Sequence, residues 1–183
     1  MKLMFASDIH GSAYYARELK RLHGLEKPDR LLLLGDLLYH GPRNDLPRDY
    51  APKEVIELLN SLSDQVLCVR GNCDAEVDQM VLDFPILAES LLLYLPDDRG
   101  CFLTHGHIYN DQNPPKLHAG DLLIHGHTHV AGIWQGPVYT TINPGSISLP
   151  KAGSERSYMV YENGRFAWKR LEDGTVYQEY SDR

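Results

Sequence analysis

The chain has 183 residues and a formal net charge of −7, from 18 lysines and arginines against 25 aspartates and glutamates. This length fits one domain, residues 1–183, that can bury a core without disulfides, and the acidic balance disfavours binding to a nucleic-acid duplex. The three cysteines form no CxxC pair, which is typical of a reduced compartment. No run resembles a signal-peptide core or approaches the roughly 20 apolar residues of a membrane span, so we expect a cytoplasmic protein without membrane contact.

The first half of the chain alternates predicted strands with predicted helices. Apolar runs predict strands at 2–7, 30–34 and 65–69. Helical spacing of apolar residues predicts one helix from a Ser12 cap to about Gly24 and a second at 53–62. The order is βαβαβ, and each strand ends in polar residues, at the edge where open α/β sheets bind ligands.

From about residue 84 onward the pattern changes to strands separated by short turns. Apolar runs predict the strands of a second sheet at 86–95, 101–104, 121–124 and 138–142. Near the end, Asn163-Gly164 favours a tight hairpin turn between two further strands, which are followed by a last one; these strands are predicted at 158–161, 165–168 and 175–180. The segment 43–50 is the longest candidate surface loop.

Side chains that bind metals follow several of these strands. Asp8 and His10 stand two apart, so in an extended chain both would point the same way. Asp36 follows four leucines and a glycine, where a buried carboxylate needs a positive partner. The remaining candidates are Asn72, His105, His127 and His129. Each alone could be a turn or cap residue, but the combination of imidazole and carboxylate suits a pair of Mn, Fe, Co, Ni or Zn ions.

These residues lie in strings whose order and rough spacing resemble the motifs of the calcineurin-like metallophosphoesterases. The strings are Asp8-Ile9-His10, Gly35-Asp36, Gly71-Asn72-Cys73-Asp74, Thr104-His105-Gly106-His107 and Gly126-His127-Thr128-His129. A closer resemblance, to the small bacterial and archaeal phosphodiesterase branch that includes the retromer scaffold subunit of eukaryotes, is strengthened by Gly41-Pro42-Arg43-Asn44 and Asn143-Pro144-Gly145-Ser146. It implies an α/β fold of four layers, with two packed mixed β-sheets flanked by helices.

The resemblance also implies two divalent metal ions, with Mn²⁺ preferred and Ni, Co, Fe or Zn as alternatives. Asp8, His10, Asp36 and His129 would bind the first metal. Asp36, Asn72, His105 and His127 would bind the second, so that Asp36 bridges the two. Such a pair lowers the pKa of a shared water and binds the phosphate oxygens while the hydroxide attacks phosphorus. The implied protein is a binuclear phosphodiesterase that hydrolyses small phosphodiesters.

The chain departs from the pattern of the family in two places. Cys73 stands where much of the family has a histidine that protonates the leaving group, and a thiol is a poor acid for an alkoxide. Asp74 could orient a ring placed at position 73, and His107 or His40 could act as the acid instead. The catalytic candidates are therefore Cys73, Asp74 and His107. Much of the family also has Asp-Arg at positions 39 and 40, where this chain has Tyr-His; Arg43 could replace that arginine.

Two other functions remain open. A non-catalytic interaction scaffold of the same fold would be expected to lose metal ligands, whereas all seven are present. A DNA exonuclease is disfavoured by the net charge and by the lack of a capping domain. Of the other histidines, we expect His125 to be structural and His23 and His118 to face solvent. The strand-rich C-terminus leaves room for a homo-oligomer.

Overall fold

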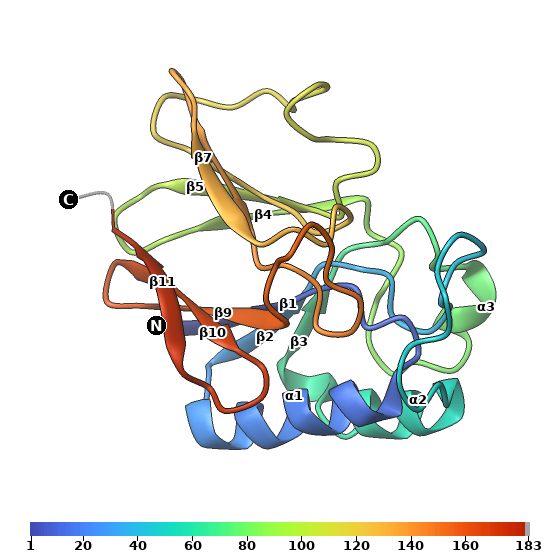
Figure 1. Cartoon of the computed structure of the whole chain (residues 1–183). Coiled ribbons are helices and arrows are strands. Elements are labelled where there is room, and N and C mark those ends of the chain that lie inside the picture. The colour runs from blue at the N-terminus through green and yellow to red at the C-terminus, as the bar shows by residue number, and fades with distance from the viewer. Residues whose placement is uncertain (182–183) are drawn as a thin grey trace.

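A computed structural model describes residues 1–181 of the chain as two packed β-sheets with helices on one side (Figure 1). The elements in chain order are β1 (Lys2–Ala6), α1 (Ala13–Glu26), β2 (Arg30–Leu33), α2 (Pro52–Asn60), a 3₁₀ helix η1 (Ser63–Gln65), β3 (Val66–Cys68), α3 (Glu76–Gln79), β4 (Ser90–Tyr94), β5 (Gly100–Thr104), β6 (Leu122–Ile124), β7 (Gly132–Gln135), β8 (Thr140–Asn143), β9 (Ser157–Glu162), β10 (Arg165–Arg170) and β11 (Val176–Tyr180). No helix of this part of the chain is long and apolar enough to cross a membrane.

The first sheet has the strand order β11-β10-β9-β1-β2-β3. β1, β2 and β3 are parallel, which confirms the predicted βαβαβ half. β9 then pairs antiparallel with β1, so the C-terminal meander extends the sheet formed by the first half of the chain. At the β9–β10 turn, Asn163 and Gly164 have φ angles of 52° and 80°, as the predicted hairpin requires.

The second sheet has the order β4-β5-β6-β8-β7, with three parallel strands inside and an antiparallel strand at each edge. β7 was not predicted from the sequence, because Gly132 is its only buried residue and pairing with β8 defines the strand. The predicted strand 86–95 begins at Ser90 instead. Ile86, in front of it, packs into the helix-side core rather than into a sheet.

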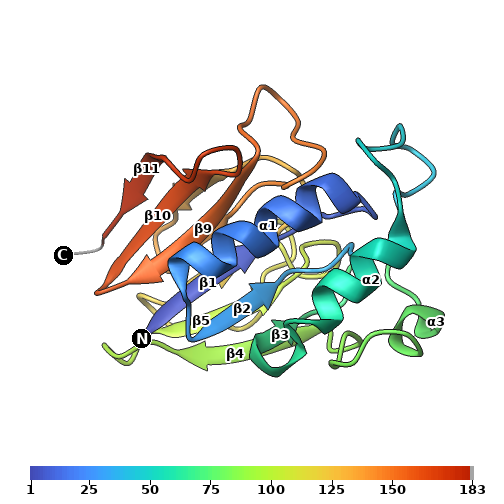
Figure 2. The ribbon, with the colours of Figure 1, turned by 90° about the horizontal axis from the view of Figure 1, so that it is seen from below.

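Alternate side chains of the first sheet supply two separate cores. Met4 and Ala6 pack against α1 and α2, whereas Leu3 and Phe5 pack against the second sheet. Figure 2 shows α1 and α2 side by side across the outer face of the first sheet. Since successive residues of a strand point to opposite faces, one apolar run fills both cores.

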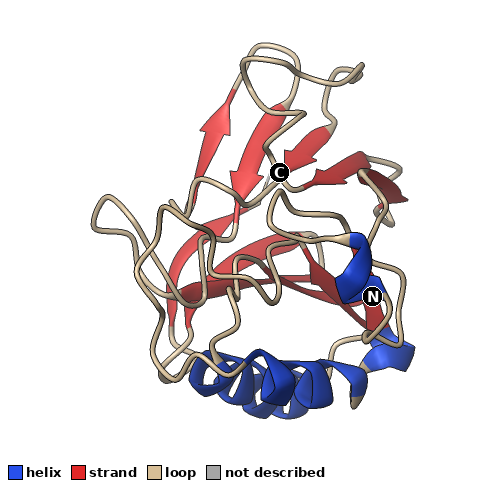
Figure 3. Cartoon of the chain, turned by 90° about the vertical axis from the view of Figure 1, so that its right-hand side faces the viewer, coloured by secondary structure: helices blue, strands red, loops and turns tan. Residues whose placement is uncertain are grey.

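The loop of residues 105–121 covers the middle of the outer face of the second sheet, whereas Leu92, Tyr94 and Trp134 on the edge strands stay exposed. Within this loop the Tyr109 ring lies 5.5 Å from the Phe102 ring, and the Asp111 carboxylate accepts a hydrogen bond from the Thr141 hydroxyl. Figure 3 shows the helices on the opposite side of the molecule. Two packed mixed sheets with flanking helices are thus confirmed, but on the outer face of the second sheet a loop stands where helices were expected.

His23 lies on the buried face of α1, not on the solvent-exposed face that we expected. His23 is 8% exposed and shares the buried face of α1 with Leu19 and Leu22. The expectation that it faces solvent was wrong because it lies one turn after Leu19 on the apolar face. Gly24 does not end the helix; Lys27 caps it in a left-handed conformation, with φ of 49°.

Candidate metal centre

All seven predicted ligands meet at one edge of the two sheets. Asp8 and His10 follow β1, Asp36 follows β2, Asn72 follows β3, His105 follows β5, and His127 and His129 follow β6. Loops that follow parallel strands leave a sheet at the same edge. The polar residues after the carboxyl ends of the parallel strands of both sheets therefore lie together at this edge.

Backbone hydrogen bonds hold the first two of these loops side by side. The N–H of Asp8 donates to the carbonyl of Gly35 at 3.1 Å, and the N–H of His10 donates to the carbonyl of Asp36 at 2.9 Å. The loop after β1 thus continues the pairing of β1 with β2 beyond the end of the sheet. This pairing carries Asp8 and His10 directly to Asp36.

Five of the ligands have left-handed backbone conformations, with φ between 51° and 64°: Asp8, His10, Asp36, His127 and His129. The expectation that Asp8 and His10 converge in an extended chain was therefore wrong. They converge because each backbone turns at its own residue. Such conformations cost on the order of 1–3 kcal/mol each and persist where the surrounding structure imposes them. Their concentration here is typical of a functional site.

Gly126 sets how closely the second sheet approaches the first at this edge. A Cβ atom at this position would lie 1.9 Å from the Ser7 hydroxyl and 2.7 Å from Asp8 Oδ2. With only hydrogen there, the backbone N–H of His127 reaches Asp8 Oδ2 at 3.1 Å. The glycine therefore allows a ligand loop of one sheet to contact a ligand of the other.

The imidazoles of His10 and His129 point their Nε2 atoms at each other. Nδ1 of His10 lies 2.8 Å from the carbonyl oxygen of Tyr39, and Nδ1 of His129 lies 2.6 Å from that of Leu149. Since a carbonyl oxygen only accepts, each Nδ1 carries the proton, and Nε2 of the neutral ring has a lone pair. These Nε2 atoms are 3.2 Å apart. Two lone pairs held face to face need a cation between them.

His105 is oriented in the same way for the other half of the site. Its Nδ1 donates to the carbonyl of Leu34 at 2.6 Å, and its Nε2 lies 3.4 Å from Asp36 Oδ2 and 3.1 Å from Asn72 Oδ1. His127 points its Nδ1 at the same Nε2, at 3.2 Å. Burial lowers the pKa of His105, but the bond to Asp36 and the charge of Asp8 outweigh it and raise this pKa to about 9. The carboxylates therefore favour positive charge at this point.

The two aspartates are nearly inaccessible to water. Asp8 is 0% and Asp36 2% exposed, and Asp8 Oδ1 has no hydrogen-bond donor among residues 1–181. Burial alone would raise the pKa of Asp8, but the neighbouring imidazoles of His10 and His129 outweigh burial and lower this pKa well below its usual range. Buried carboxylates that stay ionised need cationic partners. Three overlapping groups have their ligand atoms within 4.8 Å of one another: Asp8, His10 and His129; Asp8, Asp36 and His105; and His10, Asp36 and Cys73. This donor set fits a pair of divalent transition metals.

A cavity of about 400 Å³ opens onto these ligands. Two cationic side chains line it, Arg43 from the loop after β2 and Lys151 from the loop after β8. Arg43 was a candidate from the sequence, whereas Lys151 was missed because no motif surrounds it. The backbone N–H of Lys151 donates to the carbonyl of His129 at 3.0 Å, which places its loop beside the site.

The catalytic candidates have different surroundings. Cys73 lines the cavity, and burial together with the negative charge of Asp36 raises its pKa to about 12, so the thiol is neutral. His107 is half-buried, with its ring centre 5.4 Å from that of His105, and it does not line the cavity. Both residues are close to the ligands, but only Cys73 faces the open space.

Asp74 does not face the cavity. Its carboxylate accepts backbone N–H groups from Asp36 at 2.9 Å, Leu37 at 2.8 Å and Gly71 at 2.7 Å. Both oxygens thus accept backbone N–H groups, and the orientation of a ring at position 73 by Asp74 stays a prediction. The structure assigns it a positioning role, in which it ties the loop after β3 to the loop after β2.

A further set of positioning residues received no role in the predictions from the sequence. The hydroxyl groups of Ser146 and Ser148 both donate to the backbone carbonyl of Asp8 at 2.8 Å. The side-chain amide of Asn143 donates to the carbonyl of Gly126 at 2.8 Å. The Asn-Pro-Gly-Ser string at 143–146 was the available signal, since it lies between a buried strand and a polar loop.

Comparison with known proteins identifies the family. Residues 1–164 match the model of the calcineurin-like phosphoesterase superfamily domain. Phosphodiesterase YfcE of Escherichia coli K12 is 46% identical over 176 residues, which cover 96% of this chain and 95% of that protein. The solved structure of the E. coli YfcE phosphoesterase superposes with a TM-score of 0.96 at 43% identity, over 100% of both chains.

More distant structures share the fold alone. Vps29 of Entamoeba histolytica, solved in complex with Zn²⁺, superposes with a TM-score of 0.61 at 19% identity over 98% of each chain. The matches to the family model and to YfcE confirm the family that the motifs at positions 8 to 146 predicted. The chain belongs to the calcineurin-like phosphoesterase superfamily, as a small bacterial metallophosphoesterase.

Proposed function

We propose that the protein is a binuclear metal-dependent phosphodiesterase that hydrolyses small phosphodiesters, with Mn²⁺ as its preferred metal. The observation that carries the proposal is the opposed pair of Nε2 atoms of His10 and His129, 3.2 Å apart beside the buried Asp8. Each ring is fixed by its Nδ1 bond to a carbonyl, an arrangement typical of histidines that bind metals. The similarity to a phosphodiesterase over nearly the whole chain supports the substrate class.

Asp8, His10, Asp36 and His129 would hold one metal, and Asp36, Asn72, His105 and His127 the other. Asp36 suits the bridging position because Oδ2 lies 3.7 Å from Nε2 of His10 and 3.4 Å from Nε2 of His105. Its other oxygen, Oδ1, accepts the backbone N–H of Cys73 at 2.8 Å, which fixes the carboxylate between the two groups.

When bound, the two metals would supply the Lewis acidity that activates a water molecule and neutralises the phosphate. Arg43 and Lys151 line the cavity and would hold the remaining phosphate oxygens as negative charge develops. Cys73 also lines the cavity beside the ligands, and its neutral thiol can donate a proton only weakly. Leaving groups that need little protonation would therefore react best.

We also propose that residues 1–183 form a single domain, that the protein is cytoplasmic, that it has no duplex or membrane partner, and that it has room to form a homo-oligomer. The volume of the cavity supports a small substrate, since about 400 Å³ is in the range of roughly 300–1,000 Å³ that is usual for small-molecule sites.

The test is hydrolysis of bis(4-nitrophenyl) phosphate by the full chain reconstituted with Mn²⁺. Asp8→Asn and His127→Ala should each abolish metal-dependent cleavage while the circular dichroism spectrum stays that of the wild type. The matched control is Asp83→Asn, which changes an exposed aspartate outside the site. A wild type that stays inactive with Mn²⁺, Co²⁺ and Ni²⁺ would instead favour the non-catalytic scaffold.

A further inference from the structure

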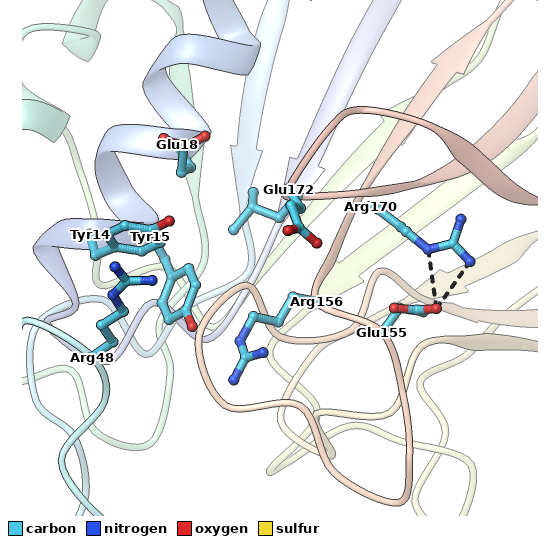
Figure 4. A pocket seen from close by; sticks show the side chains of 9 residues that line it. Tyr14, Tyr15, Glu18, Arg48, Glu155, Arg156, Arg170 and Glu172 are labelled. Carbon is cyan, nitrogen blue, oxygen red and sulfur yellow. Dashed lines mark hydrogen bonds and ion pairs between the residues drawn. The ribbon is translucent and has the colours of Figure 1, made fainter.

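A second pocket, separate from the metal ligands, lies between α1 and the C-terminal meander (Figure 4). Its volume is about 310 Å³, at the lower end of the range of roughly 300–1,000 Å³ for small-molecule sites. The walls come from the first two turns of α1, the loop 39–51, the loop 149–156, and the end of β10 with the turn that follows it. Four segments that are distant in sequence therefore build it.

Two arginines in this pocket lie over tyrosine rings. The guanidinium carbon of Arg48 lies 3.5 Å from the ring centre of Tyr14, and that of Arg156 lies 5.0 Å from the ring centre of Tyr15. The two rings touch edge to face, with their centres 5.1 Å apart. Stacking uses the flat face of a guanidinium and leaves the N–H groups at its edge free to donate. The rings thus hold the arginines in place without neutralising them.

The charges of the pocket are distributed unevenly. Glu18 is paired with Arg21 at 2.9 Å, and Glu155 is paired with Arg170 at 3.1 Å. Among residues 1–181, Arg48 and Arg156 form no ion pair with a carboxylate; Arg156 donates only to the carbonyl of Ser148, at 3.4 Å. Two guanidinium groups with unused donors in one pocket are a usual means of binding phosphate.

We propose that this pocket binds an organic phosphate, with the phosphate group on Arg48 and Arg156. Glu172, on the turn between β10 and β11, also lines the pocket and forms no ion pair within the described residues. Its carboxylate can accept hydrogen bonds from hydroxyl or amino groups of the organic part. The side chains therefore match a ligand that carries an anion at one end and hydrogen-bond donors at the other.

The pocket shares two loops with the metal centre. The loop 39–51 gives Arg43 to the metal cavity and Arg48 to the pocket, and the loop 149–156 gives Lys151 to one and Arg156 to the other. A fully extended chain spans about 3.6 Å per residue, so the backbone positions of His10 and Tyr14 are no more than about 15 Å apart. The phosphate can therefore belong either to the far end of the substrate or to a separate molecule.

Equilibrium binding of adenosine 5′-monophosphate to the full chain loaded with Mn²⁺, in phosphate-free buffer at low salt, tests the proposal. The double variant Arg48→Ala/Arg156→Ala should bind one AMP fewer per chain at saturation than the wild type. Each single variant should weaken that site roughly tenfold to a hundredfold, the usual effect of losing a charge-assisted bond. Adenosine, which has no phosphate, should not occupy the site.

The matched control is Arg165→Ala. Arg165 is exposed and paired with Glu179, and it lies at the end of β10 opposite to the end that lines the pocket. It should leave AMP binding unchanged. Equal affinity and stoichiometry in the double variant and the wild type would overturn the proposal, as would equally tight binding of adenosine. Because binding is measured without hydrolysis, this result is independent of whether the protein proves to be a phosphodiesterase.

A kinetic comparison identifies the source of the phosphate. The substrates are adenylyl adenosine with and without a 5′-terminal phosphate. A loss of kcat/KM in the double variant that is confined to the phosphorylated diester assigns the pocket to the substrate. An unchanged ratio, together with the lost AMP site, assigns it to a separate phosphate ester.

Discussion

The carboxylate of Asp74 accepts the backbone N–H of Asp36 at 2.9 Å, so a residue after β3 fixes the backbone of the central carboxylate after β2. Asp74→Asn removes one of the acceptor oxygens and leaves a buried N–H without a partner. We expect a loss of about 1–3 kcal/mol in the free energy of unfolding and weaker metal binding. Urea unfolding and metal titration measure both. In the control Asp83→Asn, on an exposed loop, both should stay as in the wild type.

Metal content distinguishes the two halves of the site. The wild type should bind two Mn²⁺ ions, and anomalous scattering should place them about 3.5–4 Å apart, the usual spacing of such pairs. Asp36→Ala should lose both metals because its carboxylate is shared, whereas His127→Ala should lose one. Elemental analysis after dialysis counts them. If Asp36→Ala retained both metals, the bridging role would be wrong.

The residue at position 73 should set the range of leaving groups. Proton donation is worth on the order of 10²–10⁴-fold where the leaving group needs it, and the raised pKa of Cys73 makes its thiol a weak donor. Cys73→His should therefore raise kcat/KM for an alkyl diester far more than for an aryl diester. Cys73→Ser, which adds no imidazole, is the control and should leave the ratio of the two values nearly unchanged. A constant ratio in Cys73→His would mean that position 73 does not reach the leaving group.

Glu26 makes stability depend on pH at a point distant from the metal centre. Burial raises the pKa of this carboxyl group, but bonds from Lys169, Lys2 and Tyr158 outweigh burial and lower the pKa below its usual value of 4.5. A lowered pKa means that the stabilisation is complete above pH 4.5 and is lost as the pH falls through the folded-state value. Glu26→Gln should therefore lose stability at pH 6 and show a shallower decline on acidification. Thermal melts between pH 6 and pH 3.5 measure this, with the exposed Glu57→Gln as the control.

Two glycines should respond to alanine in opposite directions. Gly126→Ala forces a methyl group against Ser7 and Asp8, so we expect a large loss of stability and of metal binding. Gly24→Ala meets nothing within 4 Å in the interior of α1, so it should stabilise the protein by about 0.5–1 kcal/mol. Urea midpoints compare the two variants. Similar losses of stability in both variants would show that the close approach of the two sheets does not require glycine at position 126.

Much of the candidate site could be predicted from the sequence, because each ligand follows an apolar run that must be buried. The runs before Asp36 and His105 predict strands, and polar residues at the ends of parallel strands are brought to one edge of a sheet. The chain order of the residue types was enough to indicate the family, and the hairpin at Asn163-Gly164 followed from local turn preference.

Tertiary structure decided the rest, since it depends on contacts between segments that are distant in the sequence. The left-handed backbone of Asp8 and His10 is imposed by pairing with the loop at Asp36, which no local pattern encodes. The Asp74 carboxylate accepts backbone N–H groups of two loops because the loops after β2 and β3 lie side by side at this residue. Packing between separate loops likewise decides that Lys151 lines the metal cavity and that Arg48 and Arg156 line the second pocket. The sequence by itself determined which chemical groups the protein has and where its strands end, whereas packing determined which of those groups face one another.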